Sequence, residues 1–304
     1  MSDRNPESGI HFYIVVVSFN PGEKLKKTLE SIYRQDYMDY EVVIEDSESD
    51  DGSLSSLRED RFFDTGIAKE RTHIFIEKDR GIYDGMNRAL SRITDEQSDS
   101  GITAPVFGKS YVMFLNCGDV FHDRQVLGRI ADAAEEYTGS RTDADNTDRP
   151  VIYYGDQYNL KTESVVSSSP KLNEFALYRN VPCHQVCIYD VSLFKGRAYD
   201  TTYKVRADYE HFLYCVYKKN AITKYVDVIV SDYEGGGYSE TKDSKRISEK
   251  EHNKITAEYM GDKVKKYRLL LKLSGAGLRT KLAEDPRFSK FYNGIKSGIY
   301  SLKR

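Results

Sequence analysis

The sequence has few cysteines and no long apolar run, and both absences limit the class of protein. Its 304 residues include four cysteines, too few and too scattered for the disulfide framework of a small secreted domain. No run of about 18 apolar residues is present, and no charged segment precedes an apolar one at the N-terminus. We therefore expect no membrane span, no secretory signal and a cytoplasmic protein.

Two phosphate-binding motifs and a zinc motif are also missing. No GxGxxG follows a predicted strand, which argues against a dinucleotide oxidoreductase. The segment SFNPGEKLKK lacks the spacing of a basic glycine-rich loop, which argues against a nucleotidyltransferase. Cys183 and Cys187 flank His184, but no second pair stands at ligand spacing, so we expect no structural zinc.

Four short runs rich in Val, Ile, Phe and Tyr lie in the first 120 residues, and each ends at a polar residue. They span residues 13–19, 41–44, 74–76 and 111–115. Such runs are typical of strands that are covered on both faces. Apolar residues at helical spacing lie between them, at positions 25, 29 and 32 and at 82, 86, 90 and 93. The alternation predicts an α/β fold with a parallel sheet.

Aspartates cluster at or just after the ends of these runs. In open α/β sheets the ligand binds beyond the carboxyl ends of the strands. Carboxylates repel a phosphate but can hold a divalent cation that binds one. The sequence therefore predicts a metal-bridged anionic ligand beside Asp46, Asp51, Asp79, Asp84 and Asp119.

Four strings carry a more specific signal together than any one does alone. They are SFNPGE after the first strand, IEDSESDDGS at residues 44–53, EKDRGIYDGMN at residues 77–87 and FLNCGD at residues 114–119. With these strings, residues 11–240 resemble the family 2 glycosyltransferases, an inverting group. The third string is similar to one typical of members that build bacterial surface polysaccharides.

The resemblance implies a GT-A fold, with a mostly parallel central sheet flanked by helices. It implies transfer of a sugar from a UDP- or GDP-sugar to a saccharide or polyprenyl-linked acceptor, by a peripheral enzyme at the inner face of the cell membrane. An inactive nucleotide-sugar-binding subunit is the alternative, because the metal-binding string is reduced. The residues that the resemblance assigns to the nucleotide are Ser18, Asn20, Asp46, Asp51, Asp79, Arg80 and Asn87.

Asp46 is the candidate for reading the nucleobase. In SFNPGE, helix capping is an equal interpretation, with Asn20 as the cap and Glu23 as its capping-box partner. Tyr83 and Asp84, in the third string, are assigned near the acceptor.

The string FLNCGD occupies the place of the DxD segment, which holds a metal in this family. Asn116 and Gly118 stand where aspartates often stand, so Asp119 remains as the ionised ligand. One carboxylate with diphosphate oxygens and waters can hold Mg²⁺ or Mn²⁺. We therefore expect metal binding to depend on the nucleotide.

Two later strings complete the resemblance. PCHQVCIY contains His184 and Gln185, whose partner is the acceptor, the diphosphate or the metal. In VRADYEHFL, Asp208 matches the general base, with Glu210 close by. Acids in the first turn of a helix also stabilise its dipole, which is the structural alternative for both. EGGGYS, at residues 234–239, resembles a glycine-rich flap over the donor.

The chain divides into a predicted glycosyltransferase domain, 1–240, and a basic helical extension, 241–304. Residues 263–304 carry 12 Lys or Arg against 2 acidic residues. Apolar residues at 288, 291, 292, 295 and 299 share one helical face. The extension is either a helical pair packed on the body or an anchor on an anionic membrane surface. Nucleic acid is not supported, and residues 94–109 and 138–150 are expected to be loops.

Overall fold

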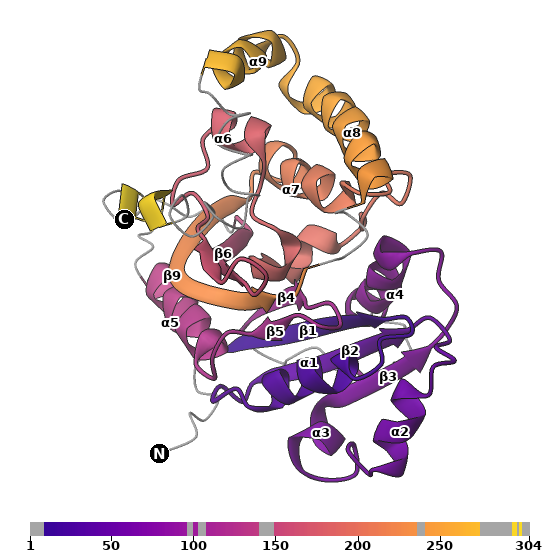
Figure 1. Cartoon of the computed structure of the whole chain (residues 1–304). Helices are drawn as coiled ribbons and strands as arrows, with labels where there is room; N and C mark the ends of the chain where they lie inside the picture. The colour runs from indigo at the N-terminus through magenta and orange to yellow at the C-terminus, as the bar shows by residue number, and fades with distance from the viewer. Residues whose placement is uncertain are drawn as a thin grey trace.

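The computed structural model describes residues 9–95, 100–102, 108–139, 149–235, 241–273, 294–296 and 298–299. Within these residues the strands form a single nine-stranded sheet in the order β3-β2-β1-β4-β8-β6-β9-β5, with β7 paired to β6 (Figure 1). Helices cover both faces of this sheet. The predicted α/β class and the GT-A architecture are confirmed.

The N-terminal half of the sheet is parallel, as predicted. β1 pairs with β2 and β4, and β2 pairs with β3, all in parallel. The first predicted strand extends one residue too far, because Phe19 lies beyond β1 and its side chain is 68% exposed. The four strands are β1 (Ile10–Ser18), β2 (Tyr40–Asp46), β3 (Thr72–Ile76) and β4 (Lys109–Phe114).

The other half of the sheet is mixed, and the sequence patterns did not predict it. β8 runs antiparallel to both β4 and β6, β9 runs parallel to β6, and β5 runs antiparallel to β9. These strands are β5 (Val120–Phe121), β6 (Val151–Asn159), β7 (Ser164–Val166), β8 (Cys187–Asp190) and β9 (Ile222–Tyr233).

Alternation along β1 creates a core on each face of the sheet. Val15 and Val17 pack with α4 and α7, whereas Ile14 and Val16 pack with α1 and α5. Successive strand residues point to opposite faces, so a strand covered on both sides must be apolar throughout. The helices are α1 (Lys24–Tyr33), α2 (Ser53–Glu59), α3 (Gly66–Arg71), α4 (Ile82–Thr94), α5 (Val126–Gly139), α6 (Glu174–Arg179), α7 (Ala207–Tyr217), α8 (Lys242–Met260) and α9 (Lys263–Leu273).

The helices α8 and α9 lie against α7 and α6 (Figure 1). Ile255 and Met260 of α8 and Tyr267 of α9 belong to the same apolar core as α7. Lys263 and Tyr267 both contact the Glu174 carboxylate of α6. Thus the first part of the predicted extension is packed on the body of the protein. The position of a domain boundary at residue 240 stays a prediction.

Both predicted loops begin or end inside regular structure. Thr94 closes α4 and Lys109 opens β4, while Thr138 and Gly139 belong to α5. Residues 96–99, 103–107 and 140–148 lie outside the described residues. Among the described residues, no helix combines the length and the apolarity that crossing a membrane requires.

Candidate active site

A cavity of about 800 Å³ lies beyond the carboxyl ends of the parallel strands. This is where the topology of an open α/β sheet places a ligand. The residues that line it come mainly from the predicted strings: Val17, Ser18, Phe19, Asn20, Pro21, Lys24, Ser47, Glu48, Lys78, Asp79, Gly81, Ile82, Asn116 and Cys117. The volume falls in the upper part of the range for small-molecule pockets, ~300–1,000 Å³. We name it the donor cavity.

The first turn joins the second turn instead of capping α1. The capping-box interpretation is wrong, because α1 begins at Lys24 and its N-cap, Glu23, makes no side-chain capping bond. Asn20 has a φ of 46° and its Nδ2 donates to Asp50 Oδ1, while the Asp50 backbone N–H donates to Asn20 Oδ1. The Gly22 N–H donates to the Asp51 carboxylate over 2.7 Å. Tertiary contacts therefore replace the local cap.

The Asp46 side chain lies at the end of β2 and is 1% exposed. Its Oδ1 accepts from the Ser49 N–H over 2.8 Å, and its Oδ2 accepts from the Ser49 hydroxyl over 2.7 Å. These bonds shape the turn that forms one wall of the donor cavity. Contact between Asp46 and a nucleobase stays a prediction.

The third string also lines the donor cavity, with residues 78, 79, 81 and 82. Asp79 Oδ1 accepts from the Gly81 N–H, and Asp84 Oδ2 accepts from the Arg80 N–H. The Arg80 side chain is 86% exposed. Both polar atoms of Asn87 bond to the backbone of Tyr199, so Asn87 joins α4 to the segment before α7.

A chain of hydrogen bonds links three of the strings near the donor cavity. Asn116 Nδ2 lies 2.9 Å from His184 Nε2, and His184 Nδ1 lies 3.3 Å from Asp208 Oδ2. Donation from Asn116 to Nε2 leaves Nδ1–H to donate to the carboxylate. The structure therefore places His184 between the predicted base and the reduced DxD segment.

Asp208 lies in the first turn of α7, and its side chain is 21% exposed. Burial by itself would raise the pKa of Asp208, but the hydrogen bonds from His184, from the Tyr209 N–H and from Tyr83 outweigh it and lower this pKa. Tyr83 Oη lies 3.1 Å from Asp208 Oδ1. The carboxylate is thus ionised at neutral pH and held from three sides.

Asp119 is 5% exposed, and its Oδ2 accepts from Gln185 Nε2 over 3.1 Å. Burial raises the pKa of Asp119 to about 6, although the Gln185 bond acts in the opposite direction. The charge of Glu234 adds to the rise. A nearby cation would therefore stabilise the ionised form of this desolvated carboxylate.

Gly118 explains why the DxD pattern is altered at this position. Its φ is 103°, and a Cβ atom there would lie 2.8 Å from Glu234 Oε2. An aspartate at residue 118 would be strained by this φ, and the end of the Glu234 side chain would have to move to make room for it. Glu234 also pairs with Lys24 over 2.7 Å. The Glu234 carboxylate therefore lies beside the position that an aspartate side chain at residue 118 would occupy.

Glu210, two residues after Asp208 in α7, takes part in a buried ion pair. It is 1% exposed, and its Oε1 accepts from Arg197 over 2.7 Å and from the Tyr259 hydroxyl. These contacts join α7 to α8. They account for Glu210 without an acceptor, and its assignment near the acceptor stays a prediction.

Sequence patterns missed several polar residues of the site. Lys24 and Lys78 are the two basic residues among those that line the donor cavity. The Glu251 carboxylate of α8 accepts from the backbone N–H groups of Lys204, Val205 and Arg206, just before Asp208. Lysines that follow a strand carry a weak signal, and nothing in the sequence connects residue 251 with residue 208.

With this geometry established, comparison with known proteins gives the class. Residues 13–194 match Glycosyl transferase family 2. The chain belongs to this family and is a glycosyltransferase. It is 28% identical over 232 residues to a PGL/p-HBAD biosynthesis glycosyltransferase of Mycobacterium bovis and to one of Mycobacterium tuberculosis, with 76% of this chain and 79% of each relative covered.

Solved structures of lower identity share the fold. TarS 1-349 of S. aureus in complex with UDP-GlcNAc matches at 18% identity with a TM-score of 0.58, covering 82% of this chain and 71% of that one. In another TarS 1-349 crystal structure the match covers 60% of the TarS chain. Mannosyltransferase PcManGT of Pyrobaculum calidifontis, in complex with GDP-Man and Mn²⁺, matches at 16% identity and a TM-score of 0.51, covering 99% and 90%.

Proposed function

We propose that this glycosyltransferase is metal-dependent and inverting, and that it moves a sugar from a nucleoside diphosphate sugar to a saccharide or lipid-linked saccharide. The observation that carries the proposal is the placement of His184, which bonds Asp208 on one side and Asn116, a wall of the donor cavity, on the other. A general base that is linked by hydrogen bonds to the donor cavity suits a single-displacement reaction.

The proposed base step needs a free lone pair on Asp208. Its Oδ1 already accepts from Tyr209 N–H and Tyr83, while Oδ2 has His184 as its partner in the described chain. Oδ2 would therefore take the proton of the acceptor hydroxyl. The acceptor oxygen bonds to the anomeric carbon as the bond from that carbon to the diphosphate breaks, and the nucleoside diphosphate leaves. Asp208 would thus activate the acceptor on the face of the sugar opposite the leaving diphosphate.

The residues around Asp119 fit a divalent cation, although the described residues contain no group of three or more His, Cys, Asp or Glu that could hold one alone. Asn116 Oδ1 is buried without a hydrogen-bond partner in the described chain, and the Asp119 carboxylate is desolvated. Two protein oxygens suit Mg²⁺ or Mn²⁺ that keeps waters and phosphate ligands. When bound, the cation would neutralise charge on the leaving diphosphate.

Names of similar proteins support the donor class. TarS was solved with UDP-GlcNAc and PcManGT with GDP-Man and Mn²⁺. The Mycobacterium relatives are named for PGL/p-HBAD biosynthesis. These names favour a UDP- or GDP-sugar and are compatible with a glycan or glycolipid product. An inactive binding subunit is disfavoured, since Asp208 keeps its partners.

A thermal-shift panel tests the donor and the metal together. UDP, GDP, TDP and CMP are each added with Mn²⁺ and with EDTA. Ligand at about 100 times its dissociation constant stabilises the folded state by about 2.7 kcal/mol, a rise of several degrees. We expect UDP or GDP to raise the melting temperature with Mn²⁺ and to lose most of this effect in EDTA. No shift with any nucleotide would contradict the proposal.

The extension also supports a proposed peripheral contact with anionic membranes. Leu269, Leu270 and Leu273 of α9 are 58%, 38% and 75% exposed, and Ile295 and Ile299 are 49% and 48% exposed. Lysines and arginines interleave with them in the sequence. Exposed apolar residues among cations are typical of interfacial helices. Residues 288, 291 and 292 lie outside the described residues.

Vesicle co-sedimentation tests the membrane contact. The variant Leu269→Gln with Leu273→Gln is compared with Leu160→Gln, a matched change at a leucine that is 44% exposed elsewhere. We expect wild type and Leu160→Gln to pellet with phosphatidylserine vesicles, less so at physiological salt. The double variant should stay in the supernatant, and equal pelleting of all three proteins would refute the contact.

A further inference from the structure

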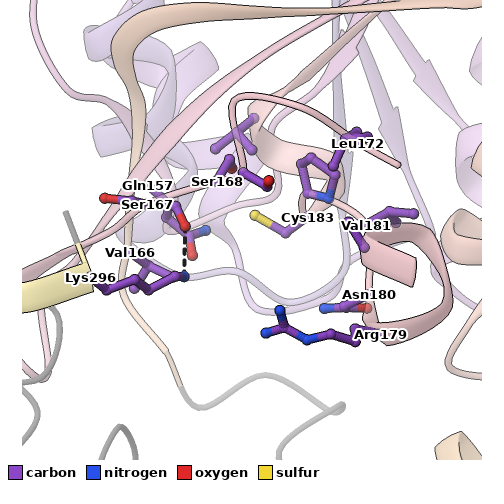
Figure 2. Close-up of a pocket in the computed structure, with 14 residues that line it drawn as sticks. Gln157, Val166, Ser167, Ser168, Leu172, Arg179, Asn180, Val181, Cys183 and Lys296 are labelled. Carbon is purple, nitrogen blue, oxygen red and sulfur yellow. Dashed lines mark hydrogen bonds between the residues drawn. The ribbon is translucent and has the colours of Figure 1, made fainter. Parts of the chain in front are cut away.

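A second cavity of about 300 Å³ lies between α6, the β6 to β7 region and the segment before η2 (His184–Val186). Ser167 and Cys183 are part of its lining, with Arg179 and Asn180 at the end of α6 (Figure 2). Lys296 reaches it from the C-terminal extension. No function has been assigned to this cavity above, and we name it the basic cavity.

Two cations share the basic cavity. Figure 2 shows Lys296 and Arg179 extending into it from different sides. The Lys296 ammonium donates to the Ser167 carbonyl over 2.6 Å, and the Arg179 side chain makes no hydrogen bond or ion pair within the described chain. Burial lowers the pKa of Lys296, the charge of Arg179 lowers it further, and Asp156 opposes the shift. The two cations therefore repel each other, which an anion between them would relieve.

The Ser167 hydroxyl is a separate indication of a ligand. Ser167 is 3% exposed and lines the basic cavity, yet its Oγ has no hydrogen-bond partner among the described residues. An unpartnered buried hydroxyl is costly. Together with a guanidinium and an ammonium it supplies donors for an oxyanion.

The basic cavity adjoins the predicted base. Asn180, Val181, Pro182 and Cys183 line it and also line a cavity of about 180 Å³ that contains Asp208. Burial raises the pKa of the Cys183 thiol to about 12, and the charges of Asp119 and Asp208 add to the rise. Residues 180–183 therefore form a wall common to the base and the basic cavity.

We propose that the basic cavity binds an anionic group of the acceptor, a sugar carboxylate or a phosphate, while the reacting hydroxyl of the same acceptor reaches Asp208 past residues 180–183. This inference rests on the proposed transfer function and deepens it by naming the acceptor class. The volume is at the lower end of the range for small-molecule pockets, which suits one acidic monosaccharide or a phosphate. Asp156 is the buried carboxylate near Lys296, and Ser168 N–H satisfies its Oδ1 over 2.8 Å.

Calorimetric titration of the full chain tests anion binding without any turnover. The probes are methyl glucuronide, neutral methyl glucoside and inorganic phosphate. The variants are Arg179→Gln and Ser167→Ala, with Arg58→Gln of α2 as the control at an exposed arginine outside the cavity. We expect wild type and Arg58→Gln to bind glucuronide or phosphate more tightly than glucoside. Arg179→Gln should weaken anion binding by about ten- to one-hundredfold, and Ser167→Ala by less.

Each outcome decides between sources or overturns the inference. Binding of glucuronide alone indicates a carboxylate, and binding of phosphate alone indicates a phosphorylated acceptor. Binding of glucoside as tight as that of glucuronide, no binding of either anion, or unchanged anion affinity in Arg179→Gln would overturn the inference. Nucleotide titration of the same proteins separates the two proposals, because a chain that binds nucleotide with Mn²⁺ but no anion retains the proposed function and loses this acceptor class.

Discussion

His184 and Asp208 face each other at 3.3 Å, Nδ1 to Oδ2, although 24 residues separate them in the sequence. The other ring nitrogen of His184 lies 2.9 Å from Asn116. One imidazole thus orients the carboxylate at the start of α7 and touches the segment after β4. A change at any of these three residues should therefore affect transfer more than folding.

Replacing Asp208 with Asn removes the proposed proton acceptor while keeping the side-chain size. Positioned general-base catalysis contributes about 10² to 10⁴ in rate. We expect turnover of Asp208→Asn to fall by about this factor with unchanged nucleotide affinity. Product formation and calorimetric titration of nucleotide with Mn²⁺ measure the two effects. Wild-type turnover would show that Asp208 is not the base.

Replacing His184 with Gln should move the pH dependence of transfer. His184 lowers the pKa of Asp208, so its removal raises that pKa. Activity needs the ionised carboxylate, and it would then be lost at a higher pH as the solution is acidified. The measurement is the acid limb of the pH profile of kcat/KM, and Arg58→Gln of α2 is the control. Asn87→Asp also lies outside this chain of bonds but is not suitable as a control. An acid limb at the wild-type pH would contradict the role of His184.

Asp46 can act on the nucleobase or through the turn that it holds. Asp46→Ala should weaken nucleotide binding by about tenfold or more, since a hydrogen bond to a charged group contributes about 1.5–3 kcal/mol. Ser49→Ala removes the hydroxyl bond to Oδ2 but leaves the backbone N–H bond to Oδ1 and the carboxylate itself. If Asp46 reads the base, only Asp46→Ala changes the preference between UDP and GDP in titrations. The same loss in both variants would assign Asp46 to the turn alone.

Glu251 shows how the C-terminal extension supports the site. Its carboxylate accepts from three successive backbone N–H groups just before α7, at 2.7, 3.1 and 2.9 Å. Glu251→Ala should cost at least about 1.5 kcal/mol of unfolding free energy and lower turnover more than nucleotide affinity. Glu249→Ala, an exposed acid on the same helix, is the control. Equal turnover in the two variants would show that α8 does not support catalysis through Glu251.

The sequence predicted those features that local patterns determine. The parallel strands could be predicted because each is a buried apolar run. Asp119, His184 and Asp208 were assigned because each lies in a string typical of the family, and their roles stay predictions. The antiparallel β8 and the contacts of Glu234, Glu251 and Lys296 could not, since each joins segments distant in the chain. Asn20 failed as a cap for the same reason: its bonds to Asp50 replace local capping.

His211 should make stability depend on pH. It is fully buried against Phe194, with ring centroids 4.3 Å apart, and neither ring nitrogen has a partner in the described chain. Burial, with a smaller contribution from the charge of Arg197, lowers its pKa from 6.5 to about 3. The unfolded chain therefore binds the proton first on acidification. This contribution to stability is complete above pH 6.5 and is lost as the pH falls toward 3, by up to about 1.4 kcal/mol per pH unit.

The variant His211→Phe isolates this contribution, because it keeps the ring and removes the titrating nitrogens. Other groups, including Asp119 with its raised pKa and His252 with its lowered pKa, remain in both proteins and cancel in the difference. Urea unfolding of wild type and variant between about pH 7.5 and 5.5, about one unit either side of the unfolded pKa, gives the free energies. We expect the wild type to lose stability relative to His211→Phe as the pH falls. Parallel curves would mean that the pKa of His211 is the same in the folded and the unfolded protein, and would contradict this prediction.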